Sequence, residues 1–214
     1  MKILLDFGHS SSKAKRVTPG KRSPYSSHKT LPAIEFFEGD WNREVGRRIY
    51  AELVKLGYDV EIIVPEDEDI SLGERVRRVN KIAKQNGAAN CLLVSIHANA
   101  AGSVGKWLNA KGFQVHVCFN SSKNSKKLAN YIFDEAEKKG LKMRRPKPNQ
   151  KYWEGNLYIL KNTSCPAILT ESGFYDNVDD CKYLLSEKGK EEITDLHVQG
   201  IINYIKALAV LPVK

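Results

Sequence analysis

Short apolar runs rich in branched residues alternate along this chain with longer segments whose apolar residues recur every three to four positions. This alternation constrains the fold most, because the short runs favour strands and the periodic segments favour amphipathic helices. Strands are predicted at residues 2–6, 58–64, 89–97, 112–119, 157–160 and 166–170, and helices at residues 42–56, 71–86, 124–139 and 188–208. The predicted fold class is therefore three-layer α/β, with a mostly parallel or mixed sheet and helices on both faces.

A length of 214 residues fits one domain, and no apolar run approaches the roughly 20 residues that span a bilayer. No membrane insertion is therefore expected. The net charge of +9 favours a polyanionic neighbour, such as nucleic acid, an acidic membrane surface or an anionic cell-wall polymer. Nucleic-acid-binding motifs are missing from the sequence, so no nucleic-acid partner is expected.

The four cysteines are widely spaced and form no C-x-x-C pair, and Cys91 and Cys118 lie in apolar runs that predict core positions. The first ten residues lack the apolar region and cleavage site of a secretory leader, so the chain carries no visible export signal.

Two segments, 10–34 and 141–155, are too long and too polar for ordinary connections. The second is basic and ends in Tyr152 and Trp153, which suits either a substrate-binding loop or a solvated one. No substrate-binding residue is assigned from the sequence.

Chemically capable side chains follow three of the predicted strands. His9 follows the first strand, His97 ends the third, and Glu171 follows the last. Ligands of open α/β sheets bind beyond the carboxyl ends of strands, so these residues are candidates for one site. Each of them alone also fits a hydrogen-bonded structural role.

Two histidines that bind a metal need a third ligand, and two histidines with one glutamate form a known zinc set. Glu35 and Glu38 precede the helix predicted at 42–56, and either carboxylate can complete the set or simply favour the helix dipole. The other histidines are predicted to have no catalytic role: His116 and His197 are interpreted as structural, and His28 as a loop residue.

Four short motifs resemble, in order, those of zinc-dependent N-acetylmuramoyl-L-alanine amidases of the type-3 peptidoglycan class. They are Gly8-His9, Glu38-Gly39-Asp40-Trp41-Asn42, Ser95-Ile96-His97-Ala98-Asn99 and Pro166-Ala167-Ile168-Leu169-Thr170-Glu171-Ser172-Gly173-Phe174. The resemblance implies that His9, Glu38 and His97 bind one Zn²⁺ ion and that Glu171 is the catalytic carboxylate.

The chain departs from this family at three places. Phe7 stands where the family usually has proline, Thr170 stands where an apolar residue is common, and the 10–34 loop lacks the family's glycine-rich character. None of these departures removes an implied ligand.

The resemblance implies hydrolysis of the amide bond between the lactyl group of N-acetylmuramic acid and L-alanine in peptidoglycan. It also implies one catalytic domain over residues 1–214 without a separate wall-binding module, a monomer, and action on the cell wall after synthesis in the cytoplasm and release or export. A phage or prophage endolysin and a bacterial amidase whose leader was removed are both consistent with it. The alternatives are another zinc amidohydrolase or peptidase on the same scaffold, and a non-catalytic basic domain that binds glycans or nucleic acid.

Overall fold

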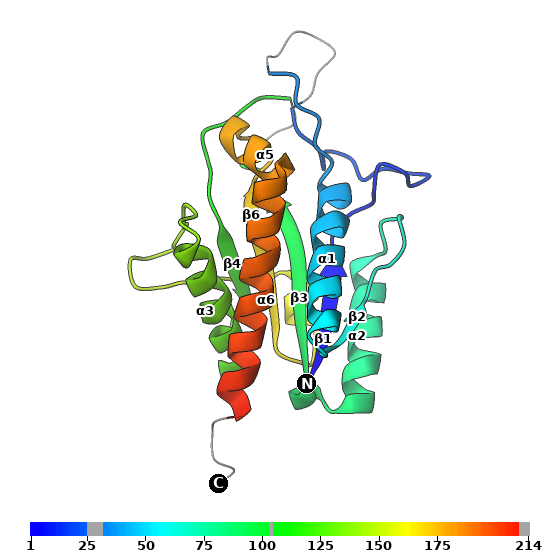
Figure 1. Cartoon of the computed structure of the whole chain (residues 1–214). Coiled ribbons are helices and arrows are strands. Elements are labelled where there is room, and N and C mark those ends of the chain that lie inside the picture. The colour runs from blue at the N-terminus through cyan, green and yellow to red at the C-terminus, as the bar shows by residue number, and fades with distance from the viewer. Residues whose placement is uncertain (25–31, 103–104, 210–214) are drawn as a thin grey trace.

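The computed structural model describes residues 1–24, 32–102 and 105–209 (Figure 1). Their strands are β1 (Lys2–Phe7), β2 (Asp59–Ile62), β3 (Cys91–Asn99), β4 (Gln114–Cys118), β5 (Trp153–Gly155) and β6 (Ala167–Phe174). Their helices are α1 (Glu38–Lys55), α2 (Leu72–Asn86), α3 (Lys123–Lys138), α4 (Tyr158–Lys161), α5 (Val178–Leu185) and α6 (Glu187–Ala209), with a 3₁₀ turn at Ala88–Asn90. The predicted three-layer α/β fold is confirmed.

The six strands form one mixed sheet in the order β2-β1-β3-β6-β4-β5. All neighbouring strands are parallel except β4 and β6, which are antiparallel. The carboxyl ends of β1, β3 and β6 therefore lie at the same end of the sheet, which is the end that carries the predicted site residues.

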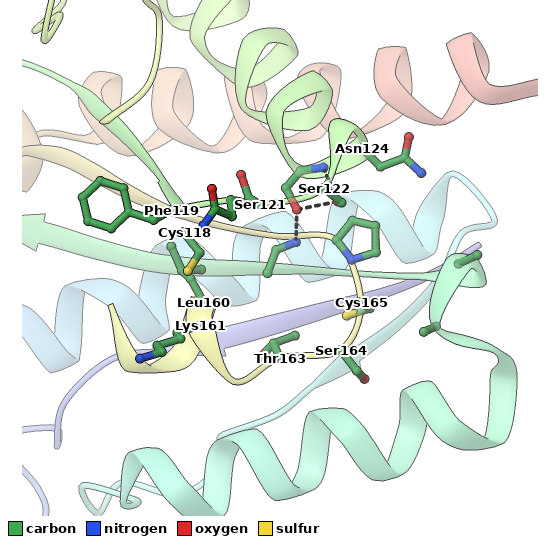
Figure 2. Close-up of a pocket in the computed structure, with 16 residues that line it drawn as sticks. Cys118, Phe119, Ser121, Ser122, Asn124, Leu160, Lys161, Thr163, Ser164 and Cys165 are labelled. Carbon is green, nitrogen blue, oxygen red and sulfur yellow. Dashed lines mark hydrogen bonds between the residues drawn. The ribbon is translucent and has the colours of Figure 1, made fainter. Parts of the chain in front are cut away.

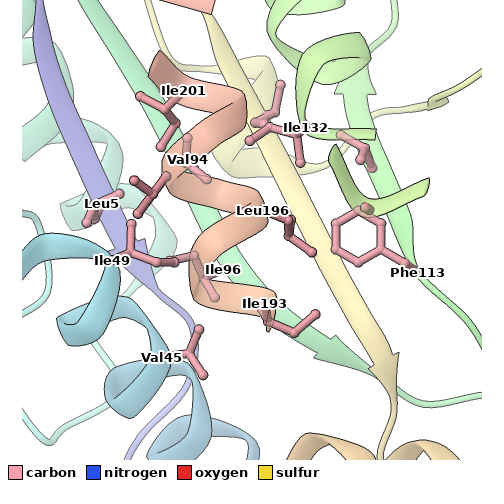
Figure 3. Close-up of a cluster of buried hydrophobic side chains, with 14 of the residues drawn as sticks. Leu5, Val45, Ile49, Val94, Ile96, Phe113, Ile132, Ile193, Leu196 and Ile201 are labelled. Carbon is pink, nitrogen blue, oxygen red and sulfur yellow. The ribbon is translucent and has the colours of Figure 1, made fainter. Parts of the chain in front are cut away.

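Successive side chains of each strand point to opposite faces of the sheet, so the core is divided into two clusters, one on each face. Ile3, Leu5 and Phe7 of β1 belong to the larger cluster, which α1, α3 and α6 cover. Figure 3 shows Val45 and Ile49 of α1 beside Ile193, Leu196 and Ile201 of α6 on this face. Leu4 points to the opposite face, where the smaller cluster lies beneath α2 and α4.

Local capping chemistry fixes the start of α2 where the sequence predicts it. The Ser71 hydroxyl accepts a hydrogen bond from the Glu74 N–H at 3.3 Å. Gly57 follows α1 with a φ of 82°, a conformation that glycine adopts without steric cost.

The strand predicted at 157–160 is wrong, because this segment forms the short helix α4. Ile159 and Leu160 are consecutive buried residues, whereas Tyr158 is exposed, so burial follows a helical turn instead of alternating. The actual strand β5 lies inside the segment 141–155 that the sequence indicates as a loop, and α5 was not predicted.

All four cysteines are free; Cys91 is buried as predicted, whereas Cys118 is only partly buried against the smaller cluster. Within the described ranges, no helix combines the length and apolar character needed to cross a membrane.

Candidate metal centre and catalytic carboxylate

His9 lies two residues after the end of β1, in a conformation that few side-chain-bearing residues adopt, with a φ of 62°. The preceding Gly8 leaves room for the ring of His97: a β-carbon at this position would lie only 2.6 Å from His97 Nδ1. The glycine of this motif thus permits the close approach of the two histidines, whose ring centroids are 5.2 Å apart.

Glu38, the first residue of α1, places a buried carboxylate between the two histidines. Its Oε1 lies 2.9 Å from His97 Nδ1 and 3.5 Å from His9 Nε2. Its Oε2 has no hydrogen-bond partner among the described residues and faces Lys21 Nζ at 3.5 Å. Glu35, the other carboxylate considered from the sequence, is exposed and lies outside this cluster.

His97 and Glu171 are register partners on the neighbouring strands β3 and β6. They have the same strand parity as Leu93 and Leu169 of the smaller cluster, so both side chains leave the sheet on that face. The strands predicted at 89–97 and 166–170 end too early. β3 continues to Asn99 and β6 to Phe174, so His97 and Glu171 lie inside strands instead of at their ends.

Burial and the charges of the cluster shift the pKa values of its members in different directions. Burial lowers the pKa of His9 to about 4, against the opposing charge of Glu38, so this ring is neutral at pH 7. Burial also acts to lower the pKa of His97, but the hydrogen bond and charge of Glu38 outweigh it and raise the pKa. Burial acts to raise the pKa of Glu38, but His97, His9 and Lys21 together lower it.

Glu171 has the opposite shift. Burial, reinforced by the negative charge of Glu38, raises the pKa of its carboxyl group to about 8 despite the opposing charges of His97 and Lys21. Its Oε2 is buried without a hydrogen-bond partner among the described residues. Such a carboxyl group can both accept and donate a proton near neutral pH.

The donor set fits a divalent metal ion. One ligand atom from each of His9, Glu38 and His97 lies within 4.8 Å of the others. Two imidazole nitrogens and one carboxylate oxygen are ligands that zinc accepts, and the unbonded Oε2 of Glu38 is consistent with a missing partner. The structure thus brings together all three residues that the sequence motifs indicate.

The other histidines behave differently. His197 is fully buried in α6, where its ring bonds Thr170 Oγ1 at 2.9 Å and the Ile193 carbonyl at 2.7 Å, so its structural role is confirmed. The partly buried ring of His116 stacks on Trp153 with centroids 6.5 Å apart. His28 lies outside the described residues.

The basic segment 141–155 is divided between the two faces of the sheet. Lys126 of α3 pairs with Glu154 at 2.9 Å and lies 5.9 Å from the centre of the Tyr152 ring, so these two side chains face α3. Trp153 points to the opposite face, the face of His97 and Glu171.

Sequence reasoning missed two charged residues of this region, Lys21 and Arg43. Lys21 lies in the long loop, and Arg43 occupies an ordinary helical position in α1. Only the folded structure brings them to Glu38 and to the backbone of His9, so no local sequence pattern marks them.

A cavity of about 410 Å³, shown in Figure 2, lies where β3 and β6 begin, at the end of the sheet opposite to the candidate site. Its lining includes Cys118, Ser122 and Cys165, beside the start of β6, and none of the four site residues. It therefore has no part in the candidate site.

Two imidazoles and a buried carboxylate, with a second carboxyl group on the next strand, make up a site suited to metal-assisted hydrolysis on an α/β sheet. The family model for N-acetylmuramoyl-L-alanine amidase matches residues 3–203, and the chain belongs to this family.

Individual relatives agree with this assignment. The endolysin of Bacillus phage SPP1 is 29% identical over 150 residues, which cover 67% of this chain and 49% of that protein. The chain thus spans about half of the length of this curated relative, and 24% of a cell wall amidase from Bacillus anthracis.

Solved structures share the fold over nearly the whole chain. An N-acetylmuramoyl-L-alanine amidase from Clostridium difficile 630 has a TM-score of 0.74 at 23% identity, covering 96% of this chain and 97% of its own. The catalytic domain of the CD27L endolysin, which targets Clostridia difficile, has a TM-score of 0.68 at 25% identity, covering 95% of this chain and 97% of its own.

Proposed function

We propose that this chain hydrolyses the amide bond between the lactyl group of N-acetylmuramic acid and L-alanine in peptidoglycan, with one Zn²⁺ ion as cofactor. One observation carries the proposal: within a member of the amidase family, the donors of His9, Glu38 and His97 converge beside Glu171. In this proposal the three residues hold the zinc ion. Zinc bound there supplies a Lewis acid that activates water and polarises the scissile carbonyl.

Glu171 is the catalytic carboxylate of the proposal. Its free Oε2 accepts a proton from the attacking water and then delivers that proton to the amine of L-alanine as the amide bond breaks. Its position opposite His97 in the strand register keeps this carboxylate next to the ligand cluster. The burial of its Oε2 limits competing contacts with bulk solvent, and its raised pKa suits a group that both takes and returns a proton.

Residues 1–214 act in this proposal as a single catalytic domain on the cell wall, which the family match over residues 3–203 supports. The net charge of +9 favours association with anionic wall material. Similarity to two endolysins favours a role in cell lysis, of phage or prophage origin. The alternative role is wall remodelling by a bacterial enzyme, which would cleave the same bond with the same site.

Glu171→Gln tests the assignment of roles, because it keeps the shape of the side chain and removes its capacity to accept a proton. We expect the variant to bind zinc like the wild type and to lose at least about 100-fold in turnover of muramyl peptides. Glu154→Gln is the matched control: Glu154 lies on the other face of the sheet, paired with Lys126, and should retain full activity. Full activity of Glu171→Gln would refute the role of Glu171.

A further inference from the structure

The backbone of His9 requires support from its surroundings. Its φ of 62° is unfavourable for a residue that has a β-carbon, and such conformations persist where neighbouring groups hold them. Because a metal ligand must be placed within a few tenths of an ångström, the groups that hold this turn also determine how well His9 can coordinate.

Arg43 of α1 contacts the His9 backbone directly. Its Nη1 donates to the His9 carbonyl at 2.6 Å and to the Gly39 carbonyl at 2.9 Å. Its Nε and Nη2 donate to the Glu66 carbonyl at 2.9 and 2.8 Å, and Nη2 also reaches the Glu68 carbonyl at 3.4 Å. One guanidinium group thus ties the His9 turn to the first turn of α1 and to the segment after β2.

These contacts are too specific for a general role in solubility. Arg43 is only 2% exposed, and all the acceptors named above are backbone carbonyls rather than carboxylates. Burying a guanidinium group is costly, and the cost is compensated only where its donors are matched by acceptors, as they are here.

The first turn of α1 also packs tightly against the same loop. A β-carbon on Gly39 would lie 2.5 Å from the carbonyl carbon of Ser10, so this helix approaches the residue after His9 without an intervening side chain. On the other side of His9, the carbonyl of Gly8 accepts a hydrogen bond from Asn42 Nδ2 at 3.1 Å. Among the described side chains, Arg43 is the one that bonds the carbonyl of His9 itself.

We propose that Arg43 is a positioning residue of the metal centre, which holds His9 in its strained backbone conformation and so keeps its imidazole in place for the ion. This inference rests on the proposed metal site. Arg43 acts through the backbone of His9 and contacts neither the substrate nor the metal in this proposal.

The test measures zinc affinity by competition with a chromophoric chelator, for Arg43→Met, Arg43→Lys and the wild type. Losing the support of a ligand typically weakens metal binding by about 10- to 100-fold, and we expect an effect of this size for Arg43→Met. Lysine retains the charge but not the planar fork of donors, so the zinc affinity of Arg43→Lys should lie between those of Arg43→Met and the wild type. Far-UV circular dichroism verifies that each variant is folded, and Arg43→Lys carries the test if Arg43→Met does not fold.

Arg78→Met is the matched control. Arg78 binds the Glu66 carboxylate at 2.7 Å and the Ile63 carbonyl at 2.8 Å, so it supports the same segment after β2 without touching His9. The zinc affinity of Arg78→Met should stay within about 2-fold of the wild type, because Arg43 still holds the His9 carbonyl in this variant.

A double-mutant cycle separates positioning from a general effect on the fold. If Arg43 acts through His9, Arg43→Met should change the remaining zinc affinity less than about 2-fold in a His9→Ala background. A folded Arg43→Met protein with wild-type zinc affinity, or equal losses with and without His9, would overturn this inference and leave the proposed function intact. A wild-type chain that binds no zinc would overturn both.

Discussion

Replacing Gly8 by alanine should destroy the metal centre without changing any ligand. A β-carbon at this position would lie 2.6 Å from His97 Nδ1, whereas ordinary contacts begin at 3.4 Å. Two other ring atoms of His97, Cε1 and Nε2, would lie closer still, so the ring must retreat by more than about 0.8 Å, which is several times the roughly 0.2 Å tolerance of a metal–ligand distance. The ring has little freedom to retreat, because its Nδ1 is bonded to the buried carboxylate of Glu38.

Isothermal titration with zinc measures the consequence. We expect Gly8→Ala to weaken zinc binding by at least about 100-fold while the protein remains folded. Gly155→Ala is the matched control, because a β-carbon on Gly155 of β5 meets no atom within 4 Å. Wild-type zinc affinity in Gly8→Ala would show that His97 is not a ligand or that its ring has room that the structure does not contain.

Three further predictions concern charge, pH and capping. Lys21→Met removes a cation 3.5 Å from Glu38 Oε2, so zinc should bind roughly 3- to 10-fold more tightly at low salt, and unchanged or weaker binding would contradict this. Burial lowers the pKa of His197 from 6.5 to about 4, so the unfolded state takes up the proton first and stability falls as the pH drops below 6.5. Between pH 7 and pH 5, protonation of this group should lower the unfolding free energy of the wild type by about 2 kcal/mol, measured by urea titration. His197→Gln should not show this loss, and equal losses in both proteins would show that His197 is not buried in its neutral form. Ser71→Ala removes the hydroxyl that caps α2 and should lower stability by about 1 kcal/mol in the same assay, whereas no change would show that the cap is dispensable.

Much of the fold is local in origin and could be predicted from the sequence. The buried strands β1, β3 and β6 each contain a run of three or four consecutive apolar residues, and Ser71 and Gly57 mark helix ends by their own chemistry. The sheet order and the antiparallel strand β4 depend on long-range pairing, which no local pattern encodes.

The errors lie where local signals are weak. The apolar run at 157–160 is as consistent with a helix as with a strand, and its packing against the smaller cluster decides for a helix. α1 begins at Glu38, four residues before its predicted start, and its N-cap Phe37 makes no side-chain capping bond that could reveal the boundary.

The candidate site was predicted only as a set of strand-end and helix-start residues with a family resemblance. The convergence of His9, Glu38 and His97 agrees with that expectation. The supporting contacts of Lys21 and Arg43 join segments that are distant in sequence, and their geometry exists only in the folded chain.

Digestion of purified peptidoglycan, followed by mass spectrometry, identifies the bond that this protein cleaves and whether the cleavage requires zinc. Zinc-loaded protein should release stem peptides with an L-alanine amino terminus. Chelation should abolish the release, and added zinc should restore it. Release of other products, or release that survives complete removal of the metal, would refute the proposed zinc-dependent amidase activity.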